Sequence, residues 1–588
     1  MGYTNPILPG FNPDPSVCRV GEDYYLVTSS FEFFPGVPIY HSRDLVHWEH
    51  IGYCLTRESQ LPLRGCRSSG GIYAPSIRHH NGTFYMTTTN TTGGGNFLVS
   101  ATNPAGPWSE PVWIRASGID PSFFFDDDGK AYYLTSRDFK TGLPISLCEI
   151  DLETGALIGE STSIWQGTGG SYPEGPHLYK KDGWYFVMIA EGGTEASHME
   201  TIARSRDIRG PYEPCPRNPI LTHRYRNTSV IHGTGHADMV EAHDGSWWIV
   251  FLAFRHAGYG LHHLGRETFI APVTWEADGW PLVNGGDAIR LDMDVPTLPQ
   301  VPLGPPRGPD RIDFDRPELD LSWNFVRTRS DVRHRIDTAN RRLELWGNPL
   351  TLDDAATPAW IGRRQTDLDC TVSVRLDASG IGEGEEAGLT VFYNDNAHYE
   401  IFLRVRDGRR TVGVRRKVDD LCVISFEQPF EEAETTLLVV ADRSRYWFGF
   451  GTDTEAALDN LVASGATRFV ATEVHPGTFT GVYLGLYATG NGHDCAKPAR
   501  FGSFSYDPFI RRNAGGRSIP YSDKTPLGTL LGDPRACEIL DRRLPGLTGK
   551  IDRSSSALAG PLSPRLAMML PGLTEADLRA AIEEISRL

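Results

Sequence analysis

The stretch GFNPDPSVCRVGEDYYLVTSS, residues 10–30, contains the pattern that recurs through the first half of the chain. It places Asp14 between two prolines, and a Gly-Glu turn, the aromatic pair Tyr24 and Tyr25 and a strand-like apolar run follow. Apolar runs on either side of a short turn are typical of a β-hairpin. The rigid setting of Asp14 just before a predicted strand raises the question of what this acid does.

Aromatic pairs follow turn signals four more times, at 84–85, 132–133, 184–185 and 247–248. Four of the five turns contain Asn-Gly or Asp-Gly, the strongest short-range hairpin signal. The pairs are 60, 48, 52 and 63 residues apart, and in four units a second hairpin-like stretch follows. Repeats of this length, with about four short strands each, predict the blades of a five-bladed β-propeller.

One position in each unit, 10 to 12 residues before the aromatic pair, carries residues that matter for chemistry. The five units place there, in order, Asp14, Ala74, Asp120, Glu174 and His236. If each unit is a blade, this position begins the inner strand beside the central axis. Three carboxylates spread over 160 residues of sequence would then converge in one funnel.

Converging carboxylates have a structural and a catalytic interpretation. They could accept hydrogen bonds from neighbouring blades or hold a structural divalent cation near the axis. Glycoside hydrolysis instead needs one carboxylic acid to protonate the leaving oxygen and a second carboxylate on the other face of the sugar. A third acid nearby can raise the pKa of the proton donor and orient it. We favour the catalytic interpretation.

The motifs together resemble glycoside hydrolase family 43, and in particular its β-xylosidases. The resemblance covers about residues 3 to 508 and rests on NPILPGFNPDPS, SSFEFFPGVPIYHSRDLVHW, SSGGIYAPSI, GIDPSFFFDDDGKAYY, SYPEGPHLY, AEGGTEASHMETIARS, GTGHADMVE and LGRETF. It implies a five-bladed propeller followed by a β-sandwich, and hydrolysis with inversion of the anomeric configuration.

The resemblance also implies roles for the three acids. Asp14 matches the general base that activates water, Glu174 matches the general acid, and Asp120 matches the acid that tunes and orients the proton donor. Inversion requires base and acid carboxyls ~6.5–9.5 Å apart, which leaves room for water.

Five further residues are candidates for sugar binding. Arg266, in LGRETF, matches an arginine that contacts the non-reducing sugar, although a salt bridge at a blade edge is the structural alternative. His236 would position Asp14 or hold a water or cation, and a hydrogen-bonded core histidine is the alternative. Phe31 resembles an aromatic wall of the pocket, and Thr194 lies on a Gly-rich loop that could approach the sugar. Tyr73 replaces a tryptophan that the family often has, a change that could alter the preference between xylose and arabinose.

The second half predicts different structures. Residues 295–310 hold six prolines and resemble a stiff linker between a catalytic domain, 1–294, and a domain of many short strands, 311–510, typical of a β-sandwich. The extension 511–588 predicts two amphipathic helices. Asp533 and Pro534 would begin the first, and Thr574 and Asp577 form a capping-box pattern before the second. We expect their apolar faces to pack against the sandwich or against a partner subunit. Of these two hypotheses we favour the partner subunit, that is, oligomerisation. The predicted fold class is therefore all-β with a short helical extension.

Composition limits the partners and the compartment. A formal net charge of −17 argues against nucleic acid and anionic membranes as partners. The N-terminus shows no signal-peptide pattern, and no apolar run approaches the ~20 residues of a membrane span. Nine scattered cysteines without a C-x-x-C motif favour a reducing cytoplasm and argue against a zinc cluster.

The sequence therefore predicts a cytoplasmic, inverting exo-β-1,4-xylosidase that acts on short xylo-oligosaccharides and requires no cofactor or catalytic metal. An α-L-arabinofuranosidase, as sole or second activity, is the alternative within the same class. A non-catalytic sugar-binding propeller is the alternative from another class. The intact set of Asp14, Asp120 and Glu174 argues against it, because a lectin needs no proton donor opposite a water activator. The sequence does not decide between xylose and arabinose, or give the chain-length preference or the oligomeric state.

Overall fold

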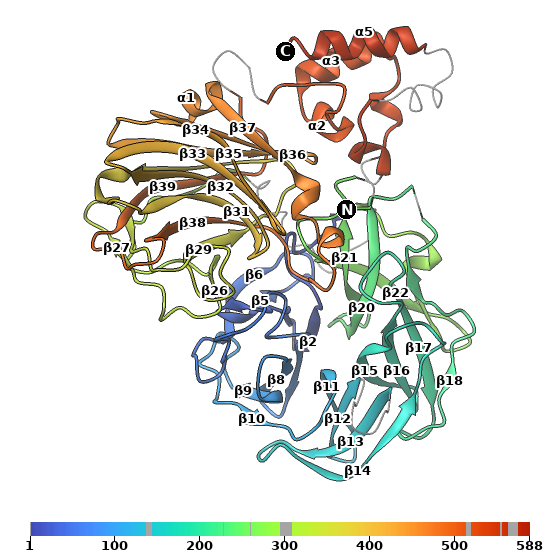
Figure 1. The fold of residues 1–588 in the computed structure, drawn as a ribbon. Helices are drawn as coiled ribbons and strands as arrows, with labels where there is room; N and C mark the ends of the chain where they lie inside the picture. Colours follow the sequence, from blue (N-terminus) through green and yellow to red (C-terminus); the bar gives the residue numbers. More distant parts are fainter. Residues whose placement is uncertain are drawn as a thin grey trace. The chain divides into compact units, whose positions relative to one another are not determined.

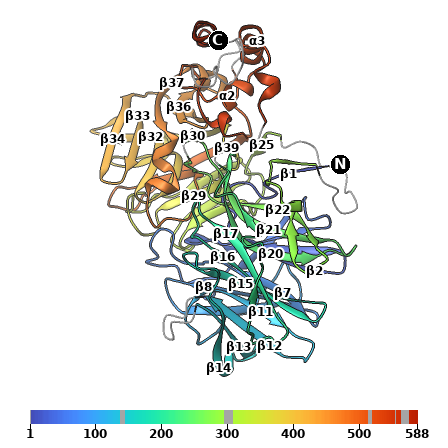
Figure 2. The same ribbon diagram turned by 90° about the vertical axis from the view of Figure 1, so that its right-hand side faces the viewer.

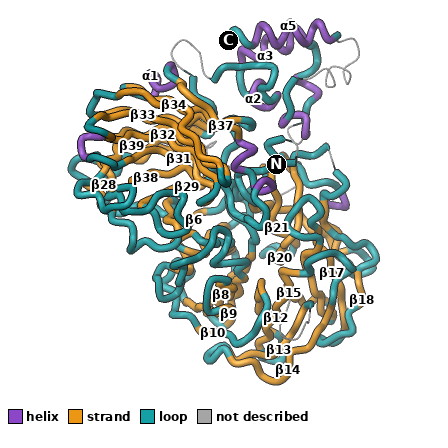
Figure 3. Tube along the Cα trace, viewed as in Figure 1, coloured by secondary structure: helices purple, strands orange, loops and turns teal. Residues whose placement is uncertain are grey.

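A computed structural model describes residues 2–136, 144–226, 228–258, 260–294, 308–512, 519–552, 555–562 and 574–588. The chain divides into two compact units, of which the first holds Met1–Asn227, Ile231–Arg255 and Arg266–Gly304 and the second holds the rest. Strands dominate both units, and the α-helices gather in the C-terminal extension, apart from the short α1 (Figure 3). The predicted all-β class is confirmed.

The first unit contains five antiparallel sheets, each built from consecutive segments of the chain (Figures 1 and 2). These are the five predicted blades of the propeller. From the inner to the outer strand they are β2 (Ser16–Val20), β3 (Asp23–Val27), β5 (Gly36–Ser42) and β6 (Glu49–Leu55); β7 (Ser76–His80), β8 (Thr83–Asn90), β9 (Gly95–Ala101) and β10 (Val112–Trp113); β11 (Ile119–Phe125), β12 (Ala131–Ser136), β13 (Ile145–Asp151) and β14 (Ala156–Trp165); β15 (Glu174–Lys181), β16 (Trp184–Glu191), β17 (Met199–Ser205) and β18 (Glu213–Pro214), with β19 (Leu221–Thr222) also on β17; and β20 (Ile231–Glu241), β21 (Trp247–Arg255), β22 (Glu267–Trp275) and β23 (Pro281–Val283).

The aromatic pairs of the sequence repeat lie on the second strand of each blade, because each follows the tight turn that joins it to the inner strand. The inner strands contact one another in the ring order β2, β7, β11, β15, β20 and back to β2. The N-terminal segment completes the ring, since β1 (Tyr3–Thr4) pairs with β24 (Asp292–Met293) and the Asn5 side chain bonds to both backbone groups of Ile270. The ring brings the starts of distant strands together around one axis.

A buried ion pair fixes the middle of this ring. Asp238, on β20, has no exposed surface and accepts two hydrogen bonds from Arg78 of β7, at 2.7 and 3.0 Å. The Ser16 hydroxyl and the Tyr179 hydroxyl donate to the same carboxylate at 2.7 and 2.8 Å. Burial opposes the charge, but Arg78 and the other partners outweigh it and lower the pKa of Asp238 to about 2. Four blades are thereby tied together by one side chain.

Replacing Asp238 with asparagine is expected to destabilise the propeller strongly. The change leaves Arg78 charged, buried and without its counter-ion, a loss of about 3–5 kcal/mol in the free energy of unfolding. Because the folded pKa lies below the ordinary value of 3.8, the pair stabilises the protein above about pH 4 and loses this effect as pH falls towards 2. Thermal denaturation should show the loss. The exposed variant Asp278→Asn, which breaks a surface pair with Arg217, should keep nearly the wild-type melting temperature, because solvent screens exposed pairs. Equal melting temperatures for the two variants would contradict this role.

The second unit contains a β-sandwich, as predicted. One sheet runs β27 (His334–Asp337), β28 (Arg342–Leu345), β39 (Ala499–Asp507), β30 (Cys370–Asp377), β35 (Glu434–Ala441), β36 (Arg445–Gly451) and β37 (Leu461–Ala466), with β25 (Asp310–Ile312) on β39. The other runs β34 (Leu421–Pro429), β33 (Arg409–Val418), β32 (Ala397–Arg406), β31 (Glu386–Asn394), β38 (Tyr483–Thr489), β29 (Ala359–Arg364) and β26 (Trp323–Val326). The domain boundaries at 294 and 510 stay predictions, and residues 295–307 of the proposed linker lie outside the described residues.

The extension beyond the sandwich forms helices where the capping signals predict them. α3 (Pro534–Arg543) begins after Asp533, whose carboxylate accepts the N–H of Arg535 at 2.8 Å, and α5 (Glu575–Ile585) begins with a complete capping box of Thr574 and Asp577. Together with α2 (Leu527–Leu531) they bury their apolar residues against α1 (Thr454–Asp459) and strand β35 of the sandwich. Of the two expected docking surfaces, the structure shows the sandwich, and oligomerisation stays a prediction.

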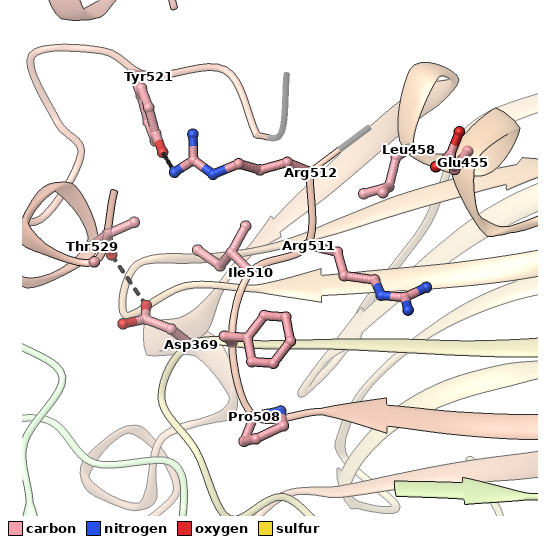
Figure 4. Close-up of a pocket in the computed structure, with 11 residues that line it drawn as sticks. Asp369, Glu455, Leu458, Pro508, Ile510, Arg511, Arg512, Tyr521 and Thr529 are labelled. Carbon is pink, nitrogen blue, oxygen red and sulfur yellow. Dashed lines mark hydrogen bonds between the residues drawn. The ribbon is translucent and has the colours of Figure 1, made fainter. Parts of the chain in front are cut away.

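A pocket of about 720 Å³ lies between the extension and the sandwich (Figure 4). Several of the side chains that line it have partners within the protein. Arg512 and Tyr521 bind Asp533, at 2.5 and 2.8 Å, and the Thr529 hydroxyl donates to Asp369 at 3.1 Å. The contact between Thr529 and Asp369 therefore links the extension to the sandwich beside the apolar core.

No helix in the described ranges combines the length and the apolar character needed to cross a lipid bilayer.

Candidate active site

In three blades, the candidate residue at or beside the inner strand has a positive backbone φ angle. Asp14, Asp120 and His236 have φ values of 54°, 54° and 49°, a region that residues other than glycine seldom adopt. The pairing registers shift beside Asp120, Glu174 and His236, as in β-bulges, which re-aim side chains. Such local strain persists only where the surrounding structure holds it, and it is typical of functional sites.

Asp14 is buried and held by three partners. Arg266, at the start of the β22 segment, donates to Oδ1 at 2.8 Å, and the Ser29 hydroxyl donates to Oδ2. His236 Nδ1 lies 3.8 Å from Oδ1. Burial opposes ionisation, but Arg266, His236, Ser29 and His198 outweigh it, so the pKa of Asp14 lies below its ordinary value. Asp14 is therefore an ionised carboxylate at neutral pH, as a water-activating base must be.

Asp120 has the opposite electrostatic setting. Burial, the charge of Glu174 and the charge of Asp14 raise the pKa of Asp120 well above its ordinary value, against a hydrogen bond from the Gly175 N–H. This coupling shows that the three carboxyls lie close together in the folded chain. Asp120 therefore keeps its proton at a pH where Asp14 has lost its own. The site thus contains one ionised carboxylate and one carboxyl whose pKa is raised by its acidic neighbours.

Two buried histidines lie beside this carboxylate group, and both are neutral. Burial lowers the pKa of His236, and lowers that of His198 to about 3. His198 donates from Nδ1 to the Gly233 carbonyl at 3.1 Å, which fixes its tautomer. A Cβ at Gly175 would lie 2.9 Å from His236 Nε2, so only glycine lets the chain after Glu174 pass this ring.

Aromatic and polar side chains form a wall next to Asp14. The Phe31 and Tyr73 rings lie 5.2 Å apart at 48°, and the Arg266 guanidinium lies 5.7 Å from the Phe31 ring centre. Arg266 also donates to the Thr194 hydroxyl at 3.0 Å, and Arg67 donates to the Tyr73 hydroxyl at 3.4 Å. A flat apolar surface with hydrogen-bonding groups at its edge is the composition of a sugar site.

The structure therefore gathers the predicted residues around one centre. Arg266 binds Asp14 and Thr194 rather than forming a salt bridge at a blade edge, and His236 lies against Asp14. Sequence reasoning missed Ser29 and His198. Ser29 stands at the end of the stretch that contains Asp14, and its place across the hairpin from Asp14 could have indicated the contact. His198 lies in the motif AEGGTEASHMETIARS but away from the repeat position that marked the acids.

Within the described ranges, no three His, Cys, Asp or Glu side chains are arranged to hold a metal ion. The structural cation near the axis stays a prediction.

An ionised carboxylate close to a carboxyl of raised pKa, with aromatic rings beside them, is the arrangement of a glycosidase. Family models agree with this class. The model described as glycosyl hydrolases family 43 matches residues 3–281, and the β-xylosidase C-terminal concanavalin A-like domain matches residues 311–507. The chain belongs to glycoside hydrolase family 43, as its motifs predicted, and neither model extends into the helical extension.

Relatives of this chain are named for two activities, xylosidase and arabinofuranosidase. The non-reducing end α-L-arabinofuranosidase BoGH43B of Bacteroides ovatus is 42% identical, with 86% of this chain and 94% of that protein covered. A xylosidase/arabinosidase of Butyrivibrio fibrisolvens is 40% identical, with 83% and 96% covered. The crystal structure of a xylan β-1,4-xylosidase from Bacillus halodurans is similar with a TM-score of 0.79 and 34% identity, covering 86% of this chain and all of that one.

Proposed function

We propose that this glycosidase is an inverting exo-β-1,4-xylosidase that releases xylose from the non-reducing end of short xylo-oligosaccharides. The observation that carries the proposal is the electrostatic contrast between two acids: Asp14 is ionised beside Arg266 and Ser29, whereas burial and the charge of Glu174 raise the pKa of Asp120 well above its ordinary value. Inverting hydrolysis needs this contrast, since base and acid must start in opposite protonation states.

The proposed reaction is a single displacement. Asp14 takes a proton from a water molecule as the water oxygen bonds to the anomeric carbon. Glu174 gives its proton to the glycosidic oxygen as the bond from that oxygen to the anomeric carbon breaks. Asp120 orients Glu174, and Arg266 and the Phe31 ring hold the terminal sugar. The product is α-xylose, and exchange with solvent returns both carboxyls to their starting states.

The second candidate activity is α-L-arabinofuranoside hydrolysis in the same pocket. Two relatives carry arabinofuranosidase or arabinosidase in their names, which supports this candidate. Tyr73 also brings a hydroxyl, bonded to Arg67, to the wall beside Phe31. The carboxylate chemistry is the same for both sugars, so the difference lies in how this wall receives the sugar hydroxyls.

We place the enzyme in the cytoplasm and expect its chemistry to need no cofactor. All nine cysteines are free thiols, which supports a reducing compartment. Short oligosaccharides taken up by the cell would be its substrates.

An NMR time course on xylotriose tests the proposal. Early release of α-xylose, before mutarotation, is the expected result, together with xylobiose as the other product. Early β-xylose would overturn inversion. An early anomeric excess on xylobiose, with none on the released xylose, would place cleavage at the reducing end and overturn release from the non-reducing end. Cleavage of α-L-arabinofuranosides with no cleavage of xylotriose would select the second candidate.

The pH profile should report the coupled carboxyls. In Asp120→Asn we expect the alkaline limb of kcat/KM to move to lower pH by about one unit, because the charge that helps to hold the proton on the pair is gone. The acid limb should move less, since Arg266 and Ser29 still hold Asp14 ionised. Rate measurements on xylobiose between about pH 4 and 9 check this, and an alkaline limb that stays in place would contradict the coupling.

A further inference from the structure

We propose that Tyr172 is the platform on which the leaving part of the oligosaccharide stacks, and this rests on the proposed function. Tyr172 lies two residues before Glu174, in the segment that leads into β15. Its side chain is 54% exposed, whereas Asp14 and Asp120 at the bottom of the site are 4% and 6% exposed. An exposed aromatic ring and the proposed acid are thus two residues apart along the chain.

The backbone places this ring beside the sugar-binding loop. The Gly192 N–H donates to the Ser171 carbonyl at 2.6 Å, so the segment before Glu174 and the loop after β16 run side by side. A Cβ at Gly193 would lie 3.2 Å from Tyr172 Cδ2, which shows that the ring borders this glycine. The next residue, Thr194, bonds to Arg266, the partner of Asp14.

The segment that carries Tyr172 is held firmly. Glu191, fully buried at the end of β16, accepts hydrogen bonds from the backbone N–H groups of Thr168 and Gly170 and from the Thr168 and Thr201 hydroxyls, at 2.7–3.0 Å. Tyr172 itself has a φ of 55°, a strained value for an aromatic residue. A strained, exposed ring on an anchored segment indicates that its orientation has a use beyond packing.

The direction of the substrate follows from the chemistry. Glu174 protonates the oxygen that joins the terminal sugar to the rest of the chain, so the leaving part lies on the solvent side of Glu174. The Tyr172 ring borders Gly193, and the next residue, Thr194, binds Arg266 of the sugar site. We therefore place the first leaving sugar against this exposed ring, which offers the flat apolar surface that a sugar face covers.

Two substrates separate this role from a structural one. Xylobiose has a leaving sugar, whereas β-D-xylopyranosyl fluoride has a leaving group of one atom that reaches no platform. For Tyr172→Ala we expect kcat/KM on xylobiose to fall about tenfold while the value for the fluoride stays within about twofold. Tyr172→Phe keeps the ring and should retain the wild-type value on both substrates. Inhibition by xylose, which occupies the deep site, should be unchanged in both variants.

The outcomes distinguish the two proposals. A wild-type enzyme that cleaves neither xylosides nor arabinofuranosides would remove the proposed function. An active wild type with an equal fall on xylobiose and fluoride in Tyr172→Ala, or with no fall on either, would overturn the platform alone. A loss in Tyr172→Phe as large as in Tyr172→Ala would assign the effect to the hydroxyl and also overturn stacking.

Discussion

Replacing Glu174 with glutamine is expected to lower kcat on xylobiose by about 10³-fold. The amide has nearly the shape of the carboxyl but no acidic proton to give to the glycosidic oxygen. An activated substrate such as 2,4-dinitrophenyl β-xyloside, whose leaving group departs without a proton, should lose less than about tenfold. The contrast between the two substrates, measured as initial rates at one pH, is the signature of a proton donor.

Binding provides the control for this variant. Glu174→Gln should still bind xylobiose in calorimetry, because the deep site formed by Arg266 and Phe31 is intact. The matched variant Glu213→Gln, on the exposed outer strand β18, should keep wild-type rates on both substrates. Equal losses on xylobiose and the dinitrophenyl substrate would remove Glu174 from the role of acid, and a rate within tenfold of wild type on xylobiose would do the same.

The propeller could be predicted because its sequence signals are local and repeated. Each blade has a tight turn followed by an aromatic pair, so the period of the fold is visible without any knowledge of distant contacts. The helix starts after Asp533 and Thr574 could be predicted for the same reason, because a capping residue acts within one helical turn. The sequence did not decide whether the sandwich or a partner subunit covers the helices, because the apolar residues of α3 and α5 meet strand β35 from a separate part of the sequence.

Only the site residues that share the repeat position could be predicted from the repeat itself. Asp14, Asp120, Glu174 and His236 occupy one repeat position, so their convergence follows from closing the ring. Arg266 and Thr194 lie off that position. Resemblance to a family motif marked Arg266, and a place on a Gly-rich loop marked Thr194. The contrast in pKa between Asp14 and Asp120 depends on burial and on charges from other blades, which no single segment of sequence contains.

Replacing Asp14 with asparagine should produce the opposite substrate pattern to Glu174→Gln. Water must be activated whatever the leaving group is, so we expect a loss of about 10³-fold on both xylobiose and the dinitrophenyl substrate. Asparagine also removes the charge that balances Arg266, although Thr194 and the Phe31 ring remain as contacts of the guanidinium. A thermal melt and a calorimetric titration with xylobiose therefore accompany the rates, and retained binding would show that the pocket is intact.

The Ser29→Ala variant completes the test of Asp14. Ser29 donates a hydrogen bond that helps to lower the pKa of Asp14, so its removal should raise that pKa. Because the base works only when ionised, the acid limb of kcat/KM should move to higher pH, while the rate at neutral pH stays within a few-fold of wild type. If Asp14→Asn keeps its activity on the dinitrophenyl substrate while losing it on xylobiose, Asp14 assists the leaving group instead. The assignments of acid and base would then have to be exchanged between the two faces of the sugar.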